Sequence, residues 1–188
     1  MSLTPQERET LLKLARETIS RVARQLEPPA IEQATASEAL QRDGACFVTL
    51  TKHGELRGCI GTLEAHRPLV VDVRENAIAA AFEDPRFPPV RPQEVKDLHV
   101  EVSVLSQPEP LAFEGPEDLI AKLRPEVDGV VIKRGWRRAT FLPQVWEKLP
   151  KAEEFLEHLC LKAGLAPTDY RRPGLEVYTY QVEMFEEE

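Results

Sequence analysis

Apolar residues near the start of the chain recur every three or four positions, which is the spacing of one face of an α-helix. Thr4 and Glu7 have the spacing of a capping box, and Pro5 suits the first helical position. The pattern therefore predicts a helix that runs from Thr4 to a break at Pro28-Pro29. Its apolar face consists of Leu11, Ala15, Ile19, Val22 and Leu26.

A second stretch with helical spacing begins at Pro68 and ends at Pro85. Its apolar face consists of Leu69, Val70, Val73, Ala77, Ala80 and Ala81. Between the two predicted helices, residues 30–43 carry a mixed pattern, which indicates a loop with a short helical turn.

Strand patterns lie on both sides of the second helix. Residues 45–51 are rich in β-branched and aromatic side chains, and a His53-Gly54 turn signal separates them from a hairpin partner over residues 56–62. Residues 99–105 alternate, so Val100, Val102 and Val104 face one way and His99, Glu101 and Ser103 face the other. Residues 84–92 hold too many prolines for a helix or a central strand and predict an ordered extended loop.

The C-terminal half holds shorter elements. They are helices over 116–123 and 153–163, the second ended by Gly164, and strands over 129–132, 137–142 and 175–185. Because helices and strands do not alternate regularly and hairpins recur, we expect an α+β fold with a mainly antiparallel sheet flanked by helices. The 188 residues suit a single two-lobed domain over 1–188, with 108–145 as the candidate for an inserted smaller lobe.

Composition narrows the class of protein. With 42% hydrophobic and 30% charged residues the chain resembles a soluble globular protein, and its net charge of -8 disfavours nucleic acid and anionic membranes as partners. Three cysteines are too few, and odd in number, for a disulfide framework. No basic-then-apolar leader and no apolar run of about 20 residues is present, so we expect a cytoplasmic protein without a membrane segment.

The hexapeptide Leu56-Arg57-Gly58-Cys59-Ile60-Gly61 concentrates the candidate chemistry. A nearby guanidinium lowers the pKa of a thiol, and the thiolate is the reactive form. Glycines let a backbone approach a ligand or a second strand closely. Cys59 is therefore the candidate catalytic residue, and Arg57, Gly58 and Gly61 are candidate ligand-binding residues. The alternative is that Cys59 is a small buried residue of a strand, because free cysteine is among the most buried residue types.

The register of the predicted hairpin bears on this choice. A two-residue turn at His53-Gly54 places Cys59 opposite Val48 and on the same face as Cys46, which permits a redox pair of the two thiols. A three-residue loop with Gly54 in the left-handed region places Cys59 opposite Phe47 and Cys46 on the other face. Both loops are common, so the sequence leaves the register open.

Other polar residues are candidates for the same site. Asp84 and Arg86 lie in the rigid proline loop, where they suit a polar-ligand contact at the rim or, alternatively, a structural turn. No histidine is adjacent to Cys59, so a general base would come from elsewhere, and Glu101, Ser103 and His99 on one strand face are candidates. That face is alternatively plain solvent surface.

The chain also contains one basic, aromatic cluster and one pair of residues with metal-ligand spacing. The cluster could bind RNA, a phosphate-bearing ligand or an acidic partner, or form a solvated hairpin tip. It consists of Lys133, Arg134, Trp136, Arg137 and Arg138. Glu154 and His158 have helical metal-pair spacing, but no Cys-x-x-Cys or His-Glu-x-x-His motif occurs, and the sequence names no metal and no cofactor.

The hexapeptide belongs to an ordered series of motifs. The others are Phe47-Val48-Thr49-Leu50, Pro68-Leu69, Asp84-Pro85-Arg86-Phe87, Glu101-Val102-Ser103-Val104-Leu105, Asp128-Gly129-Val130, Phe141-Leu142-Pro143-Gln144-Val145 and Leu159-Cys160-Leu161-Lys162-Ala163-Gly164-Leu165. In this order, from about residue 5 to residue 185, the chain resembles the AMMECR family, also called AmmeMemoRadiSam system protein A. The resemblance implies a two-lobed α+β fold with an antiparallel sheet.

The resemblance also implies partners in a shared pathway, namely a Memo-type protein and a radical-SAM protein. It settles no activity, so whether the protein is an enzyme stays open. Our expectation is a polar or anionic small molecule bound in a cleft at residues 56–61, with Cys59 as the thiol of an enzyme or enzyme subunit. The alternative is a non-catalytic module that docks a protein or nucleic acid through the same surface.

Overall fold

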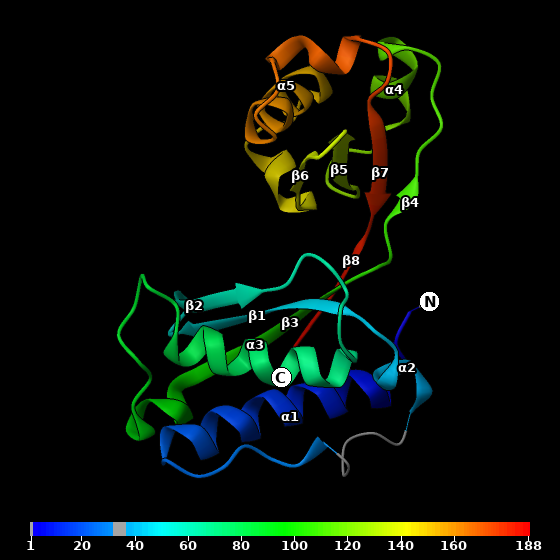
Figure 1. The fold of residues 1–188 in the computed structure, drawn as a ribbon. Coiled ribbons are helices and arrows are strands. Elements are labelled where there is room, and N and C mark those ends of the chain that lie inside the picture. Colours follow the sequence, from blue (N-terminus) through cyan, green and yellow to red (C-terminus); the bar gives the residue numbers. More distant parts are fainter. Residues whose placement is uncertain (1, 32–36) are drawn as a thin grey trace. The chain divides into compact units, whose positions relative to one another are not determined.

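The computed structural model describes residues 2–31 and 37–188 and divides the chain into two compact units (Figure 1). Unit 1 consists of Met1–Ser106 and Glu183–Glu188, and unit 2 of Gln107–Val182. The expected inserted lobe covered 108–145, whereas unit 2 continues to Val182 because the helices and the strand after residue 145 share its hydrophobic core. The expected α+β class with antiparallel sheets is confirmed.

Unit 1 is built on a sheet with the strand order β2-β1-β3-β8. The strands are β1 (Ala45–Lys52), β2 (Glu55–Gly61), β3 (Leu98–Leu105) and β8 (Val182–Glu186). Helices α1 (Pro5–Ala23) and α3 (Leu69–Phe82) lie on the same face of this sheet (Figure 1). Shorter helices are α2 (Glu38–Gln41) and the 3-10 helix η2 (Pro92–Asp97).

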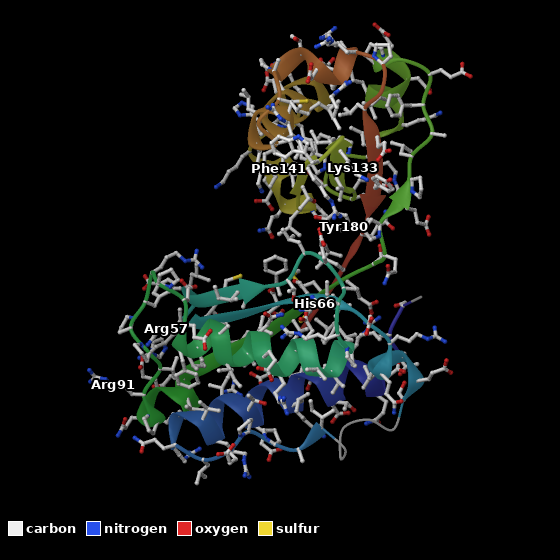
Figure 2. All side chains as sticks on the ribbon, viewed as in Figure 1. Arg57, His66, Arg91, Lys133, Phe141 and Tyr180 are labelled. Carbon is white, nitrogen blue, oxygen red and sulfur yellow. The ribbon has the colours of Figure 1, made fainter. Side chains whose placement is uncertain are left out.

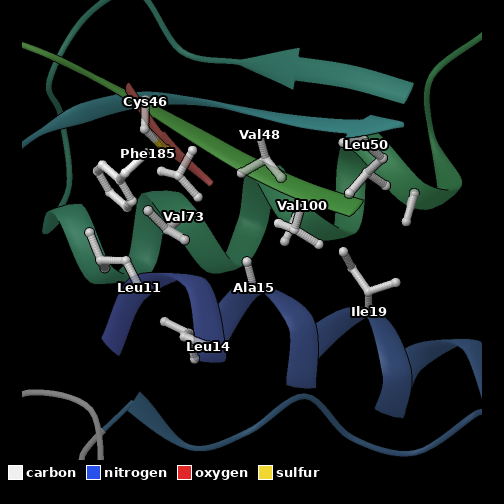
Figure 3. Packing of buried hydrophobic residues seen from close by; sticks show 14 of the residues in the cluster. Leu11, Leu14, Ala15, Ile19, Cys46, Val48, Leu50, Val73, Val100 and Phe185 are labelled. Carbon is white, nitrogen blue, oxygen red and sulfur yellow. The ribbon is translucent and has the colours of Figure 1, made fainter. Parts of the chain in front are cut away.

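The core of unit 1 lies between this sheet and the two helices. Figure 3 shows side chains of α1 and α3 meeting the inward side chains of β1 and β3. The labelled residues are Leu11, Leu14, Ala15, Ile19, Cys46, Val48, Leu50, Val73, Val100 and Phe185. The predicted alternation of β3 is confirmed, since Val100 and Val102 are buried while His99, Glu101 and Ser103 are half-buried on the opposite face.

Helix α1 begins as predicted and ends earlier. Thr4 accepts a hydrogen bond from Glu7 N at 3.3 Å, and the Glu7 carboxylate accepts one from Thr4 N at 2.7 Å. The helix stops at Ala23, because Gln25 takes the left-handed conformation with φ 61°. The predicted place of Leu26 on the apolar face of the helix is therefore wrong, because Leu26 lies beyond the end of the helix and is 53% exposed. Of the ambiguous stretch 30–43, residues 32–36 lie outside the described residues.

Unit 2 holds a second sheet with the order β4-β7-β5-β6. Its strands are β4 (Glu109–Pro110), β5 (Gly129–Arg134), β6 (Arg137–Phe141) and β7 (Glu176–Tyr180). Its helices are α4 (Pro116–Lys122), α5 (Ala152–Lys162) and the 3-10 helices η3 (Pro143–Glu147) and η4 (Pro167–Arg171). Within the core, the Trp146 ring stacks on Phe155 with centroids 3.8 Å apart.

The predicted strand over 175–185 is wrong in one respect, because it is two strands in two different sheets. Tyr180 ends β7, and its ring fills the space that a side chain at Gly129 would occupy in unit 2. Phe185, on β8, is buried in the core of unit 1. A single run of apolar residues thus contributes to two cores, and no local signal marks the change of sheet.

The described residues contain no helix that is both long enough and apolar enough to span a bilayer.

Substitution of Trp136 by Phe should remove most of the tryptophan fluorescence that acrylamide quenches. Trp136 is 88% exposed at the β5–β6 turn, whereas Trp146 is 1% exposed against Phe155. Stern–Volmer titration of the two proteins measures the difference, with far-UV circular dichroism as the control for folding. Equal quenching of the variant and the native protein would contradict the placement of the two indoles.

Candidate functional site

The β1–β2 hairpin has a register that neither sequence alternative predicted. Its turn is the two-residue His53-Gly54 loop, with φ 53° and 83°, and Lys52 pairs with Glu55. A β-bulge then follows, because Thr51 pairs with Leu56 while Leu50 pairs with Gly58, which leaves Arg57 as the extra residue. Cys59 therefore lies opposite Thr49 instead of Val48 or Phe47.

The shift separates the two thiols of the hairpin. Cys46 is fully buried on the face that α1 and α3 cover, whereas Cys59 is half-buried on the opposite face with Thr49. Burial, and then the negative charge of Asp72, raises the pKa of Cys46 well above its ordinary value. A Cys46–Cys59 redox pair is therefore excluded in this fold, because a strand places successive side chains on opposite faces.

Packing accounts for both glycines of the hexapeptide. A Cβ at Gly58 would lie 2.1 Å from the carbonyl oxygen of Ala80, so β2 touches the backbone of α3 directly. A Cβ at Gly61 would lie 2.3 Å from the Phe47 ring. Both positions thus need glycine for close approach within unit 1.

Arg57 is held by a carboxylate. Its Nε and Nη2 lie 3.3 and 3.2 Å from the two carboxylate oxygens of Glu94 in η2, and only 12% of its side chain is exposed. Lys52 Nζ at 3.2 Å and the backbone N–H of Arg91 at 3.0 Å also donate to Glu94. These donors, Arg57 foremost, lower the pKa of Glu94 to about 2. Arg57 and Arg91 accordingly lie at the same end of unit 1 (Figure 2).

Asp84 and Arg86 bind the backbone of Cys59. The Asp84 carboxylate, 2% exposed, accepts the Cys59 N–H at 2.9 Å, and Arg86 Nη2 donates to the Cys59 carbonyl at 3.2 Å. Arg86 also donates to Asp84 through Nε at 2.9 Å and Nη2 at 2.7 Å. The Arg86 guanidinium holds the pKa of Asp84 well below its ordinary range. The proline loop thus covers the outer edge of β2 at Cys59.

The side chain of Cys59 begins a row that crosses three strands. Thr49 pairs with Cys59 on one side and with Glu101 on the other, and Thr49 Oγ1 lies 3.3 Å from Cys59 Sγ. We call Cys59, Thr49 and Glu101 the Cys59 row. Burial, and then repulsion from Glu186, raises the pKa of Glu101.

A second row follows on the same face. There Phe47 pairs with Gly61 and with Ser103. The structure thus brings Glu101 and Ser103 to the face that carries Cys59. His99 is on this face as well, with its Nε2 3.1 Å from a Glu186 carboxylate oxygen.

Sequence reasoning missed a buried polar network at the start of α3. The Asp72 carboxylate, fully buried, accepts hydrogen bonds from Cys46 N at 2.9 Å, Arg67 Nε at 2.8 Å and the Thr62 hydroxyl at 2.6 Å. The Asn76 amide donates to it at 3.0 Å. The available signal was two polar residues four positions apart within the apolar face of a helix. With these donors in place, the network joins α3 to the ends of β1 and β2.

The basic cluster at the β5–β6 turn is largely engaged within unit 2. Arg134 donates to the carbonyls of Asp169, Arg172 and Pro173 at 2.8–3.2 Å, and Arg137 donates to the Gly164 carbonyl. Lys133 Nζ lies 3.7 Å from Glu176. These cations therefore hold the hairpin to its neighbours.

No group of three or more His, Cys, Asp or Glu side chains within residues 2–31 and 37–188 is arranged to hold a metal ion. Glu154, which has metal-pair spacing with His158, accepts a hydrogen bond from Lys151 Nζ at 3.1 Å.

Comparisons with known proteins point to one family. The family model of AMMECR1 matches residues 12–185. The chain is 44% identical over 191 residues to a protein of Methanothermobacter thermautotrophicus, covering 99% of this chain and 97% of the relative. A protein of Thermotoga maritima is 40% identical over 171 residues, covering 90% and 91%. The crystal structure of the uncharacterized protein PH0010 of Pyrococcus horikoshii superimposes with a TM-score of 0.79 at 36% identity, covering 99% of this chain and 94% of the other.

Substitution of Gly58 by Ala should reduce the free energy of unfolding by about 1–3 kcal/mol, the usual cost of overpacking. The new methyl group would meet the Ala80 carbonyl oxygen, which belongs to the backbone of α3 and cannot rotate away. Urea denaturation measures the change. Gly54→Asn in the same hairpin is the matched control, because its left-handed site has no atom near the added Cβ. An unchanged stability of Gly58→Ala would refute the close approach.

Substitution of Glu94 by Gln should destabilise unit 1 at neutral pH by about 1–3 kcal/mol, since it removes the charge that holds Arg57 and Lys52. The pKa of Glu94 in the folded protein, about 2, lies below its ordinary value of 4.5. The stabilisation is therefore complete above about pH 4.5 and is lost as the pH falls through about 2. Urea denaturation of both proteins across this range should show their difference shrinking with acid.

The control is Glu55→Gln, an exposed carboxylate on the same hairpin. A difference between Glu94→Gln and the native protein that stays constant with pH would show that the carboxylate charge of Glu94 is not the stabilising feature.

Proposed function

This chain belongs to the AMMECR1 family, and from that premise we propose that it binds a polar small molecule on the face of β1, β2 and β3 that carries the Cys59 row. Cys59 is the group that contacts the ligand, or reacts with it when the ligand carries an electrophile. Glu101 and Ser103 supply hydrogen-bonding groups on β3. As part of the same proposal, the protein acts in one pathway with a Memo-type protein and a radical-SAM protein.

The observation that carries the proposal is the fixed placement of the Cys59 thiol. Asp84 and Arg86 hold both backbone polar groups of Cys59, and the thiol lies 3.3 Å from the Thr49 hydroxyl. Groups fixed before binding lose less conformational entropy when a ligand arrives. Arg57 is paired with Glu94, and Gly58 and Gly61 pack closely within unit 1. The thiol of Cys59 is therefore the part of the hexapeptide that supports a site.

The charges around the row narrow the ligand class. Arg57 is paired with Glu94 and Arg86 with Asp84, so neither guanidinium is an uncompensated cation. The face itself carries Glu101, with Glu186 near enough to raise its pKa. Opposite charge favours binding and like charge opposes it, so we propose a neutral or cationic polar ligand, whereas the sequence predicts a polar or anionic one.

Protection of Cys59 from alkylation tests the proposal. Intact mass spectrometry of the native protein treated with iodoacetamide should show one modified thiol, because Cys46 and Cys160 are fully buried. Among neutral, cationic and anionic metabolites, a neutral or cationic compound should slow this reaction severalfold and raise the melting temperature. Glu101→Gln should abolish the protection, and Glu55→Gln, with the same change of net charge, should preserve it.

Two results would overturn the proposal. One is that Cys59 resists alkylation in the native protein and reacts only after unfolding, because the thiol would then have a structural role. The other is protection by macromolecular fractions of a cell extract and by no metabolite, which would establish the docking module instead.

A further inference from the structure

Unit 2 contains a groove of about 780 Å³ between residues 110–116 and residues 170–178. Leu175 and Val177 are buried lining residues, and Leu111 and Phe113 from the other segment are partly buried beside them. The Leu111 N–H donates to the Val177 carbonyl at 2.8 Å, which joins the two segments next to the β4–β7 pairing. The groove therefore has apolar lining residues from two fixed segments.

The charged lining residues are Arg171, Arg172 and Glu176. Glu176 lies 3.7 Å from Lys133 Nζ, and Arg172 Nη1 lies 3.2 Å from an Asp169 carboxylate oxygen. Arg171 differs from both, because its guanidinium lies over the Tyr170 ring, 5.0 Å from the centroid, and no carboxylate among the described residues is paired with it. Arg171 thus brings to the groove a guanidinium that forms no ion pair among the described residues.

We propose that this groove binds a small organic carboxylate with an apolar body, the carboxylate on Arg171 and the apolar part against Leu111, Phe113 and Val177. A groove of this volume is within the range of small-molecule sites, about 300–1,000 Å³, which are mostly apolar with a few polar groups that fix orientation. An exposed arginine over a tyrosine is common by itself. Here it coincides with an apolar groove, and the two features together match an amphipathic anion.

The site is independent of Cys59, since its lining residues belong to unit 2. If the groove binds no carboxylate, the proposed ligand site at Cys59 is unaffected. If Cys59 binds no ligand, the proposal for the groove is likewise unaffected.

Titration of the full chain with octanoate, octanamide and acetate tests the inference by calorimetry and by amide chemical shifts. Octanoate should bind at least about 10-fold more tightly than octanamide, because the amide lacks the charge that Arg171 attracts. Acetate should bind more weakly than octanoate by a similar factor, because it has no apolar body. Amide shifts should concentrate at Leu111, Phe113 and Val177.

Arg171→Gln should reduce octanoate affinity to that for octanamide. Arg91→Gln, which removes the same charge from an exposed position in unit 1, is the matched control and should leave the affinity unchanged. Equal affinities for octanoate and octanamide would overturn the proposal in favour of a merely apolar groove. No saturable binding, or an equal effect of the two arginine substitutions, would refute the site altogether.

Discussion

The buried carboxylate of Asp84 is the contact on which the geometry around Cys59 depends. Strand β2 is at the edge of its sheet, and the Cys59 N–H and C=O point away from β1, toward Asp84 and Arg86. Such free edge groups otherwise invite pairing with another chain. The Asp84–Arg86 pair satisfies both with one acceptor and one donor. Because the backbone N–H and C=O of Cys59 point away from β1, Thr49 and Cys59 form a non-hydrogen-bonded pair of the antiparallel ladder. The side chains of such a pair lie closest together, which fits the 3.3 Å between Thr49 Oγ1 and Cys59 Sγ.

The bulge at Arg57 decides which face of the sheet carries the thiol. A slip of one residue moves a side chain to the other face of a strand. Without the extra residue, the two-residue turn would place Cys59 opposite Val48, on the side of α3 and Cys46. The bulged Arg57 is held by Glu94, and Gly58 lies directly against Ala80. Contacts with η2 and α3 therefore select the register that the turn alone does not determine.

Local signals explain what could be predicted from sequence. The capping box of α1, the alternation of β3 and the Gly164 end of α5 depend on residues a few positions apart, and the structure confirms each. The bulge, the Arg57–Glu94 pair and the division of residues 175–185 between two sheets depend on partners distant in the chain. Because Arg57 is two residues from Cys59, the sequence predicts that its guanidinium acts on the thiol, whereas its partner is the carboxylate of Glu94 in η2.

The difference between local and long-range contacts also changes which residues make up the candidate site. In the hexapeptide, Gly58 and Gly61 serve close packing, Ile60 packs against the core and Arg57 is paired, so its composition reflects the fold of unit 1. A ligand on the Cys59 face would meet the thiol together with side chains that β1 and β3 contribute. Chemistry at this face would consequently depend as much on Thr49 and Glu101, which β1 and β3 place in one row with Cys59, as on the hexapeptide.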